Sequence, residues 1–236
     1  MSTTFTPGDR DATVRVERRL AHPPERVWRA VSEPAGLAAW FPATVEIDLR
    51  IGGQVTFSFG SDGEVTDLDP PRLLAFTWSG EHIRFELEPD GDGTRFRLTH
   101  TFPDRSAGAS SAAGWQECIE ALSRSLEGLP VPPSDPAAIR AEHERLLAEF
   151  GLATPVAQRL PDGWQVQIER QLIAPAEVVA PELPAASDGM RFELREGTGM
   201  GARLLATWTG PDASGRDTAL VELPRRVEEL VARIGR

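Results

Sequence analysis

The chain has 236 residues, which corresponds to about 1.6 domains of ordinary size, enough for one large hydrophobic core but not for two. It is acidic, with 25 Lys and Arg against 36 Asp and Glu and a net charge of −11, so nucleic acid and anionic membrane surfaces are poor partners. The sequence has no Lys, Tyr or Asn, which excludes a P-loop lysine, a Schiff-base lysine and a tyrosine general acid.

Cysteine content and the hydropathy pattern indicate where the protein works. A single cysteine, Cys118, leaves no partner for an internal disulfide and excludes a metal site built from several thiolates. The first residues are polar and lack the apolar stretch of a signal peptide, and no run of about 18 apolar residues predicts a transmembrane helix. We therefore expect a protein of the reducing cytoplasm that has no membrane partner.

The chain begins with a polar lead-in, a strand and two short helices. We expect residues 1–12 to be disordered, and the alternation over residues 14–20 predicts a strand. Pro24 suits the first turn of the helix that follows, because its missing N–H would have no partner there. A second short helix is predicted over residues 34–41.

Residues 44–102 alternate between apolar and polar side chains in six runs that Gly- and Pro-rich turns separate. This pattern is typical of short antiparallel strands that follow one another in a meander. In four of the runs we take the apolar set as the inward face, because the alternate positions are mostly Arg, Glu, Thr and Ser. The inward sets are Val55, Phe57 and Phe59; Leu74, Phe76 and Trp78; Ile83, Phe85 and Leu87; and Phe96, Leu98 and His100.

Two further helices are predicted after the meander. The first covers residues 113–126 and has one apolar stripe, formed by Trp115, Cys118, Ile119, Leu122 and Leu126. A Pro-rich linker leads to the second helix, which Asp135 caps and Gly151 ends. On this second helix, Arg140 with Glu144 and Arg145 with Glu149 have the i,i+4 spacing of ion pairs on a solvated face.

The remaining residues, 152–236, resemble parts of the first half. We interpret them as a degenerate partial repeat that keeps one strand, two later strands and a terminal helix. That helix is expected to begin near Leu223, because Pro224 would interrupt a longer one. Chance similarity in a chain rich in Arg, Glu and Leu is the alternative. The matching segments are VRVERRLAHPPERVW (14–28) with VQIERQLIAPAEVVA (166–180), and RFEL (84–87) with RFEL (191–194).

Five segments in order carry a resemblance to a known family: PPERVWRAVSEPAGLAAWF, PPRLLAFTW, RFELEPDGDGTRFRLTHTF, GWQECIEALSRSLEG and PAAIRAEHERLLAEFG. Together they resemble the AHSA-type proteins of the START-like (SRPBCC, helix-grip) superfamily, bacterial relatives of the C-terminal domain of the activator of heat-shock protein 90 ATPase. The resemblance implies an α+β fold in which a curved antiparallel sheet grips a long C-terminal helix around an elongated apolar cavity. We expect a complete helix-grip domain over residues 12–151 and a truncated second copy over residues 152–236.

The inward aromatic side chains form the candidate binding site. Each of them alone would be explained by core packing, but together they suit the cavity that the resemblance implies, since small-molecule pockets are mostly apolar with few polar anchors. A buried Trp also brings an N–H that needs a partner. The candidate ligand-binding residues are Trp28, Trp40, Phe57, Phe59, Phe76, Trp78, Phe85, Phe96, His100, Trp115 and Ile119.

His100 is the candidate polar anchor, and a core histidine with satisfied hydrogen bonds is the alternative. Cys118 fits a small buried hydrophobe, whereas a nucleophilic role would need a nearby histidine and positive charge. The four histidines lack metal-ligand spacing, and PDGDGT at residues 89–94 lacks the calcium-loop pattern and fits a hairpin turn. Nucleotide-binding and nucleophile-elbow motifs do not occur, so we expect no metal, no cofactor and no catalytic residue.

These observations favour a non-enzymatic protein that binds a small apolar or amphipathic molecule between sheet and helix. Two alternatives remain open. One is a protein that interacts with a chaperone, as the family's heat-shock protein 90 activators suggest, or with a second copy of itself. The other is a small-molecule cyclase or hydrolase on the same fold, whose chemistry would have to come from His100, Cys118 and acidic side chains.

Overall fold

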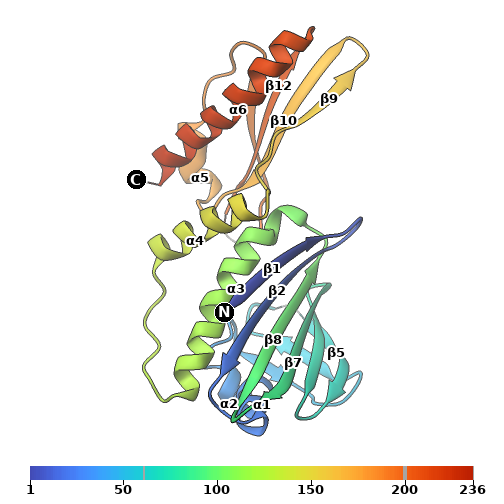
Figure 1. The fold of residues 1–236 in the computed structure, drawn as a ribbon, viewed down its shortest axis with the longest axis vertical. Helices are drawn as coiled ribbons and strands as arrows, with labels where there is room; N and C mark the ends of the chain where they lie inside the picture. Colours follow the sequence, from blue (N-terminus) through green and yellow to red (C-terminus); the bar gives the residue numbers. More distant parts are fainter. Residues whose placement is uncertain (61, 199–200, 236) are drawn as a thin grey trace. The chain divides into compact units, whose positions relative to one another are not determined.

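The computed structural model describes residues 1–60, 62–198 and 201–235, and it divides into two compact units, residues 1–139 and 140–236 (Figure 1). The division falls inside the helix α4 (Pro136–Glu149), so most of this helix belongs to the second unit rather than to the first. Each unit has its own antiparallel sheet. Among the described residues, no helix combines the length and the apolar character that a membrane crossing requires.

The first unit is built on an eight-stranded sheet. Its strands are β1 (Ser2–Pro7), β2 (Ala12–Leu20), β3 (Val45–Ile47), β4 (Gln54–Phe57), β5 (Asp62–Asp69), β6 (Leu73–Trp78), β7 (Glu81–Asp90) and β8 (Gly93–Phe102). Their order is β1-β2-β8-β7-β6-β5-β4-β3, and every neighbouring pair is antiparallel. The strands from β3 to β8 therefore form the meander that the alternating pattern predicts, and β8 returns to pair with β2.

One long helix packs on this sheet. The helical segments of the unit are α1 (Pro24–Ser32), α2 (Pro34–Leu37), the 3-10 turn η1 (Arg105–Ala107) and α3 (Gly108–Leu126). Helix α3 lies on β2 (Figure 1) and buries one side, which includes Trp115, Ile119 and Leu122. It begins at Gly108 rather than at residue 113, because η1 leads directly into it. The sheet and α3 form the α+β helix-grip arrangement that the resemblance implies.

The start of the chain is a strand, so the expectation of a disordered lead-in is wrong. Strand β1 pairs with β2, from Ser2 opposite Glu17 to Pro7 opposite Ala12. Gln116 of α3 also donates a hydrogen bond of 2.7 Å to the hydroxyl of Thr3. The segment is rich in Thr, which suits a strand, and its polar composition is that of an edge strand with a solvated face.

The two faces of the first sheet differ as the alternation predicts. On the inner face Phe76, Phe85 and Phe96 are fully buried. The outer face carries ion pairs that cross between strands, such as Arg84 with Asp67 at 2.9 Å and Arg97 with Glu17 at 3.0 Å. The apolar face therefore turns toward α3, and the charged face is solvated.

The second unit has a four-stranded sheet and one long helix. Besides most of α4, its elements are β9 (Val156–Leu160), β10 (Gly163–Gln171), α5 (Ala176–Val179), the 3-10 turn η2 (Ala180–Glu182), β11 (Met190–Arg195), β12 (Arg203–Gly210) and α6 (Ala213–Ile234). The strand order is β11-β12-β10-β9, and the three pairs are antiparallel. The sequence predicted three strands here. Strand β9 is the additional one, and it forms a hairpin with β10.

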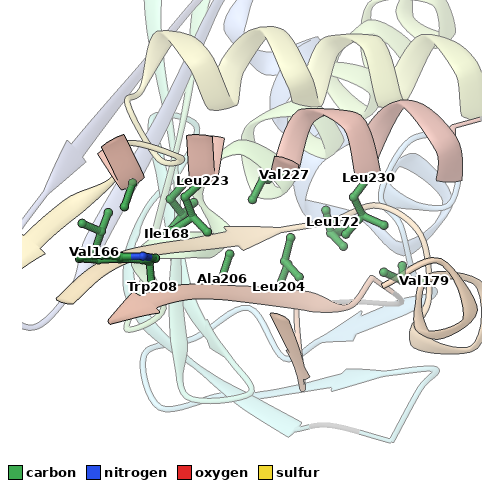
Figure 2. Close-up of a cluster of buried hydrophobic side chains, with 11 residues drawn as sticks. Val166, Ile168, Leu172, Val179, Leu204, Ala206, Trp208, Leu223, Val227 and Leu230 are labelled. Atoms are coloured by element: carbon green, nitrogen blue, oxygen red, sulfur yellow. The ribbon is translucent and has the colours of Figure 1, made fainter. Parts of the chain in front are cut away.

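The core of the second unit lies between its sheet and α6 (Figure 2). The helix begins at Ala213, where the side chain of Asp212 accepts a hydrogen bond of 2.7 Å from the N–H of Gly215. The expected start near Leu223 is wrong, because the helix continues through Pro224. Residues on both sides of the proline pack on the same sheet, and this packing offsets the lost helical hydrogen bond. They are Ala219, Leu223, Val227 and Leu230.

The second sheet has the strand order of one part of the first sheet. The series β9-β10-β12-β11 corresponds to β1-β2-β8-β7, both in order and in direction. The registers also correspond. Val14 of β2 lies opposite His100 of β8, and Val166 of β10 lies opposite Trp208 of β12. Val14 and Val166 are the residues that the sequence alignment matches, so Trp208 takes the register position of His100.

Candidate functional site

The inner face of the first unit carries a connected cluster of aromatic rings, which we call the aromatic cluster. The rings come from four strands, from α3, from the turn after β4 and from the segment that follows α2. Neighbouring ring centroids lie 4.8 to 6.5 Å apart, within the range of favourable aromatic pairs. The members are Trp40, Phe41, Phe57, Phe59, Phe76, Trp78, Phe85, Phe96, His100, Phe102 and Trp115.

Two of the candidate residues stand apart from these ring contacts. Trp28 is half-buried on α1, and in the described part of the chain its ring belongs to none of the pairs. Ile119 is fully buried on α3, one helical turn after Trp115. Phe41, in contrast, is central: its ring centroid lies 5.6 Å from those of both Trp78 and Trp115. Sequence periodicity could not give it this place, because Phe41 follows α2 in an irregular segment.

Phe59 is exposed, so its expected inward position is wrong. Strand β4 ends at Phe57, and the chain turns at Gly60, which has a positive φ of 86°. The Phe59 side chain is 53% exposed, but its ring still stacks on Phe57 at 5.5 Å and on Trp78 at 5.6 Å. The aromatic cluster therefore reaches the surface at Phe59.

His100 is the polar centre of the aromatic cluster. The indole N–H of Trp115 donates to its Nδ1 at 3.0 Å, and its Nε2 lies 2.6 Å from a carboxylate oxygen of Glu81. Because an indole N–H can only donate, Nδ1 carries no proton, and Nε2–H is the donor to Glu81. The imidazole is therefore neutral and uses both nitrogens. It is a satisfied buried histidine, and it also positions a carboxylate.

A two-residue hairpin turn holds Glu81 at the rim of the aromatic cluster, which is the edge where Phe59 and Glu81 reach solvent. Ser79 and Gly80 connect β6 to β7 with positive φ values of 51° and 84°, the conformation that two-residue turns between twisted strands adopt. The register places Glu81 directly opposite Trp78, so both side chains lie on the inner face. The Glu81 side chain is 33% exposed and thus faces both His100 and solvent.

Cys118 lies on α3 and is partly buried. Burial, together with the charge of Glu117, raises the pKa of its thiol to about 12. The thiol is therefore protonated at neutral pH and is a poor nucleophile.

The described residues contain no group of three or more His, Cys, Asp or Glu that could hold a metal ion. The PDGDGT segment forms the expected hairpin turn between β7 and β8, with Asp90 opposite Gly93. The carboxylate of Asp92 in this turn pairs with Arg19 at 2.5 Å. The acidic residues of the turn therefore have a structural role that requires no bound ion.

The second unit contains a buried charged group that sequence reasoning missed. Arg170 of β10 is 5% exposed and pairs with Glu144 of α4, so the expected pair of Arg140 with Glu144 is wrong. Burial alone would raise the pKa of Glu144, but a hydrogen bond from His143 and the charge and hydrogen bond of Arg170 lower it to about 2. The available signal was the inward position of Arg170 in an alternating strand, which demands a partner.

Comparison with known proteins gives the family of the first unit. Residues 21–127 match the model of the family described as Activator of Hsp90 ATPase homolog 1-like protein. The first unit contains an AHSA-type domain. No curated protein matches the sequence.

Solved structures show that this AHSA-type domain has a familiar fold. The chain is similar to the conserved protein of unknown function EF2215 from Enterococcus faecalis, with a TM-score of 0.56 and 22% identity over 63% of this chain and 90% of that one. It is also similar to the crystal structure of CalU16 from Micromonospora echinospora, with a TM-score of 0.52 and 21% identity over 62% of this chain and 94% of that one. At these identities the similarity shows a shared fold.

Proposed function

We propose that the chain binds a small apolar or amphipathic molecule at the aromatic cluster of the AHSA-type domain, without converting it chemically. The observation that carries the proposal is a series of ring contacts that runs from the exposed Phe59, through Trp78, to the buried His100 and its partly exposed partner Glu81. Such a surface offers stacking area to an apolar group at one end and hydrogen bonding at the other.

The state of the polar groups supports binding rather than catalysis. A general base or nucleophile needs a free lone pair or an ionised thiol. His100 accepts from Trp115 and donates to Glu81, and the thiol of Cys118 is protonated. A cyclase or hydrolase that used His100 or Cys118 would first have to break one of these arrangements.

A chaperone interaction is the second candidate function, and the family match favours it. The matched family model describes homologues of an activator of the Hsp90 ATPase. A pull-down of an Hsp90-type chaperone with the purified full chain tests this candidate. A stable complex supports it, and recovery no better than that of an unrelated acidic protein contradicts it.

We also propose that the second unit is a partial copy of the first that keeps no equivalent site. The shared strand order and register support this interpretation. Trp208 stands at the register position of His100, and its indole N–H donates to the backbone carbonyl of Asp188 at 3.1 Å. A Cβ atom at Gly215 would lie only 2.8 Å from the indole. The ring therefore fills the space beside α6 tightly.

Native mass spectrometry of the purified chain, followed by a titration with 3-phenylpropanol, tests ligand binding. We expect a co-purified small molecule or a saturable change in tryptophan fluorescence. Phe59→Ser should weaken binding of the probe about tenfold, because it removes one stacking surface worth about 1 to 2 kcal/mol. Ile51→Ser is the matched control, since Ile51 is 58% exposed in the same unit and belongs to no ring contact. Equal effects of both variants, or no saturable signal, would contradict the proposal.

A further inference from the structure

The rim of the aromatic cluster carries an uncompensated negative charge. Glu81 accepts a hydrogen bond from His100, and the tautomer set by Trp115 makes that imidazole neutral. Within the described residues, Glu81 forms an ion pair with no arginine. Glu144, in contrast, has a positive partner in the buried guanidinium of Arg170. A two-thirds-buried carboxylate with only a neutral donor favours the arrival of a cation.

The rings next to Glu81 also favour a positively charged ligand. Phe57, Phe59 and Trp78 lie nearly parallel, with interplanar angles of 15°, 17° and 29° and centroids 5.5 to 5.6 Å apart. Trp78 is also the cross-strand neighbour of Glu81. The faces of aromatic rings are electron-rich and attract cations, most strongly in Trp. An anionic head group would meet repulsion from both the rings and the carboxylate.

We propose that this rim is a binding site for an organic cation, an apolar ligand with an ammonium head. The ammonium group pairs with Glu81 and lies against Trp78, while the apolar part stacks on Phe59. His100 holds the carboxylate in place through its hydrogen bond. This inference rests on the proposed function, and it names the class of ligand that the aromatic cluster takes. It places the ligand at the exposed rim, because the rings below are closely packed.

A matched series of three probes tests the charge preference on the full chain at pH 7 and low salt. The probes are 3-phenylpropylamine, 3-phenylpropanol and 3-phenylpropionate, which share their ring and chain and differ in the charge of the head. We expect the amine to bind at least tenfold more tightly than the alcohol, and the carboxylate most weakly. The affinity for the amine should also fall as salt is added, since the pair is partly exposed.

Glu81→Gln isolates the contribution of the carboxylate. It should remove the advantage of the amine, so that the amine and the alcohol bind this variant with affinities within about twofold of each other. Glu46→Gln is the matched control, because it removes the same charge at an exposed position of the same unit, and it should leave the preference intact. The comparison of the three probes on the unaltered chain needs no variant and decides the question even if Glu81→Gln folds poorly.

The possible results separate this inference from the proposed function. Equal binding of the three probes, or tighter binding of the carboxylate, overturns the cation preference and leaves ligand binding standing. Binding of the amine that Glu81→Gln does not weaken also overturns it. If none of the probes binds and no small molecule co-purifies, the proposed function fails and the cation site fails with it.

Discussion

Single buried polar side chains in this protein take their chemistry from the partners that the fold brings to them. The N–H of Trp115 makes His100 a neutral donor to Glu81. Burial without a positive neighbour makes Cys118 an inert thiol, with a pKa of about 12. Residue type and spacing identified both residues as inward. They did not reveal these states, because each state depends on an atom from another element.

The pair of Glu144 and Arg170 leads to a prediction about acid stability. We expect Glu144→Gln to lower the free energy of unfolding of the second unit at pH 7 by about 2 kcal/mol, because the buried guanidinium loses its carboxylate. The folded pKa of Glu144 lies below its ordinary 4.5, so its contribution is present above that pH and is lost as the pH falls toward 2. Hydrogen exchange of the β10 amides in denaturant, at pH 7 and pH 3, measures this loss.

Glu142→Gln on the same helix is the control. Glu142 pairs with Arg145, which is 54% exposed, and exposed ion pairs contribute little to stability, so the loss should be clearly smaller. Equal losses of unfolding free energy in the two variants would show that the burial of Arg170 does not strengthen its ion pair. A loss at Glu144 that is as large at pH 3 as at pH 7 would contradict the assignment of the charged pair.

At the scale of elements, the boundaries of the two long helices are set by caps and packing rather than by the apolar stripe. Helix α3 follows a 3-10 turn in which the N–H of Ser106 donates to Asp104 at 3.1 Å. Helix α6 starts at the cap provided by Asp212 and passes through Pro224. The sequence placed both starts too late, because the first turns of each helix have few large apolar residues to mark them.

Replacing Pro224 measures how much stability the proline inside α6 costs the second unit. Pro224→Ala should raise the free energy of unfolding of the second unit by about 1 to 3 kcal/mol, since it restores a helical N–H and removes the clash of the ring with the preceding turn. Thermal and urea unfolding measure the change. Val221→Ala, at a position 68% exposed on the same helix, shows the effect of helix propensity alone and should stay below about 1 kcal/mol. A destabilised Pro224→Ala would instead show that the proline ring contributes packing that the core needs.

At the scale of the whole molecule, the chain consists of two units with separate cores, and an exposed segment precedes α4, the helix in which they divide. Residues 127–135, between α3 and α4, are exposed throughout and contain three prolines. Such a segment lacks the buried contacts that protect a backbone from proteases. Each sheet, in contrast, has its own long helix on its apolar face, so each unit should resist cleavage by itself.

Limited proteolysis should therefore divide the chain at this linker. We expect thermolysin to cut first beside Leu129 or Val131, which are 46% and 43% exposed, and to leave two resistant fragments. Mass spectrometry of the fragments identifies the site. The double variant Leu129→Ser, Val131→Ser should slow the first cut severalfold. Early cleavage within β10 or α6, with rapid loss of the C-terminal fragment, would contradict a folded second unit.

The periodic patterns of the sequence determined the inner face of the meander, and its resemblance to a known family implied the α+β helix-grip arrangement of the first unit. Period-two and helical patterns are local, and any fold that buries one face of these segments must obey them. Only the tertiary structure decided that Phe59 is exposed, that β1 and β9 are strands, and that Arg170 pairs with Glu144. The sequence arithmetic of about 1.6 domains suggested one complete and one partial unit, and the folded chain places most of α4 in the second. These features depend on which distant segment covers a surface or supplies a partner, and that information is not contained in any local pattern.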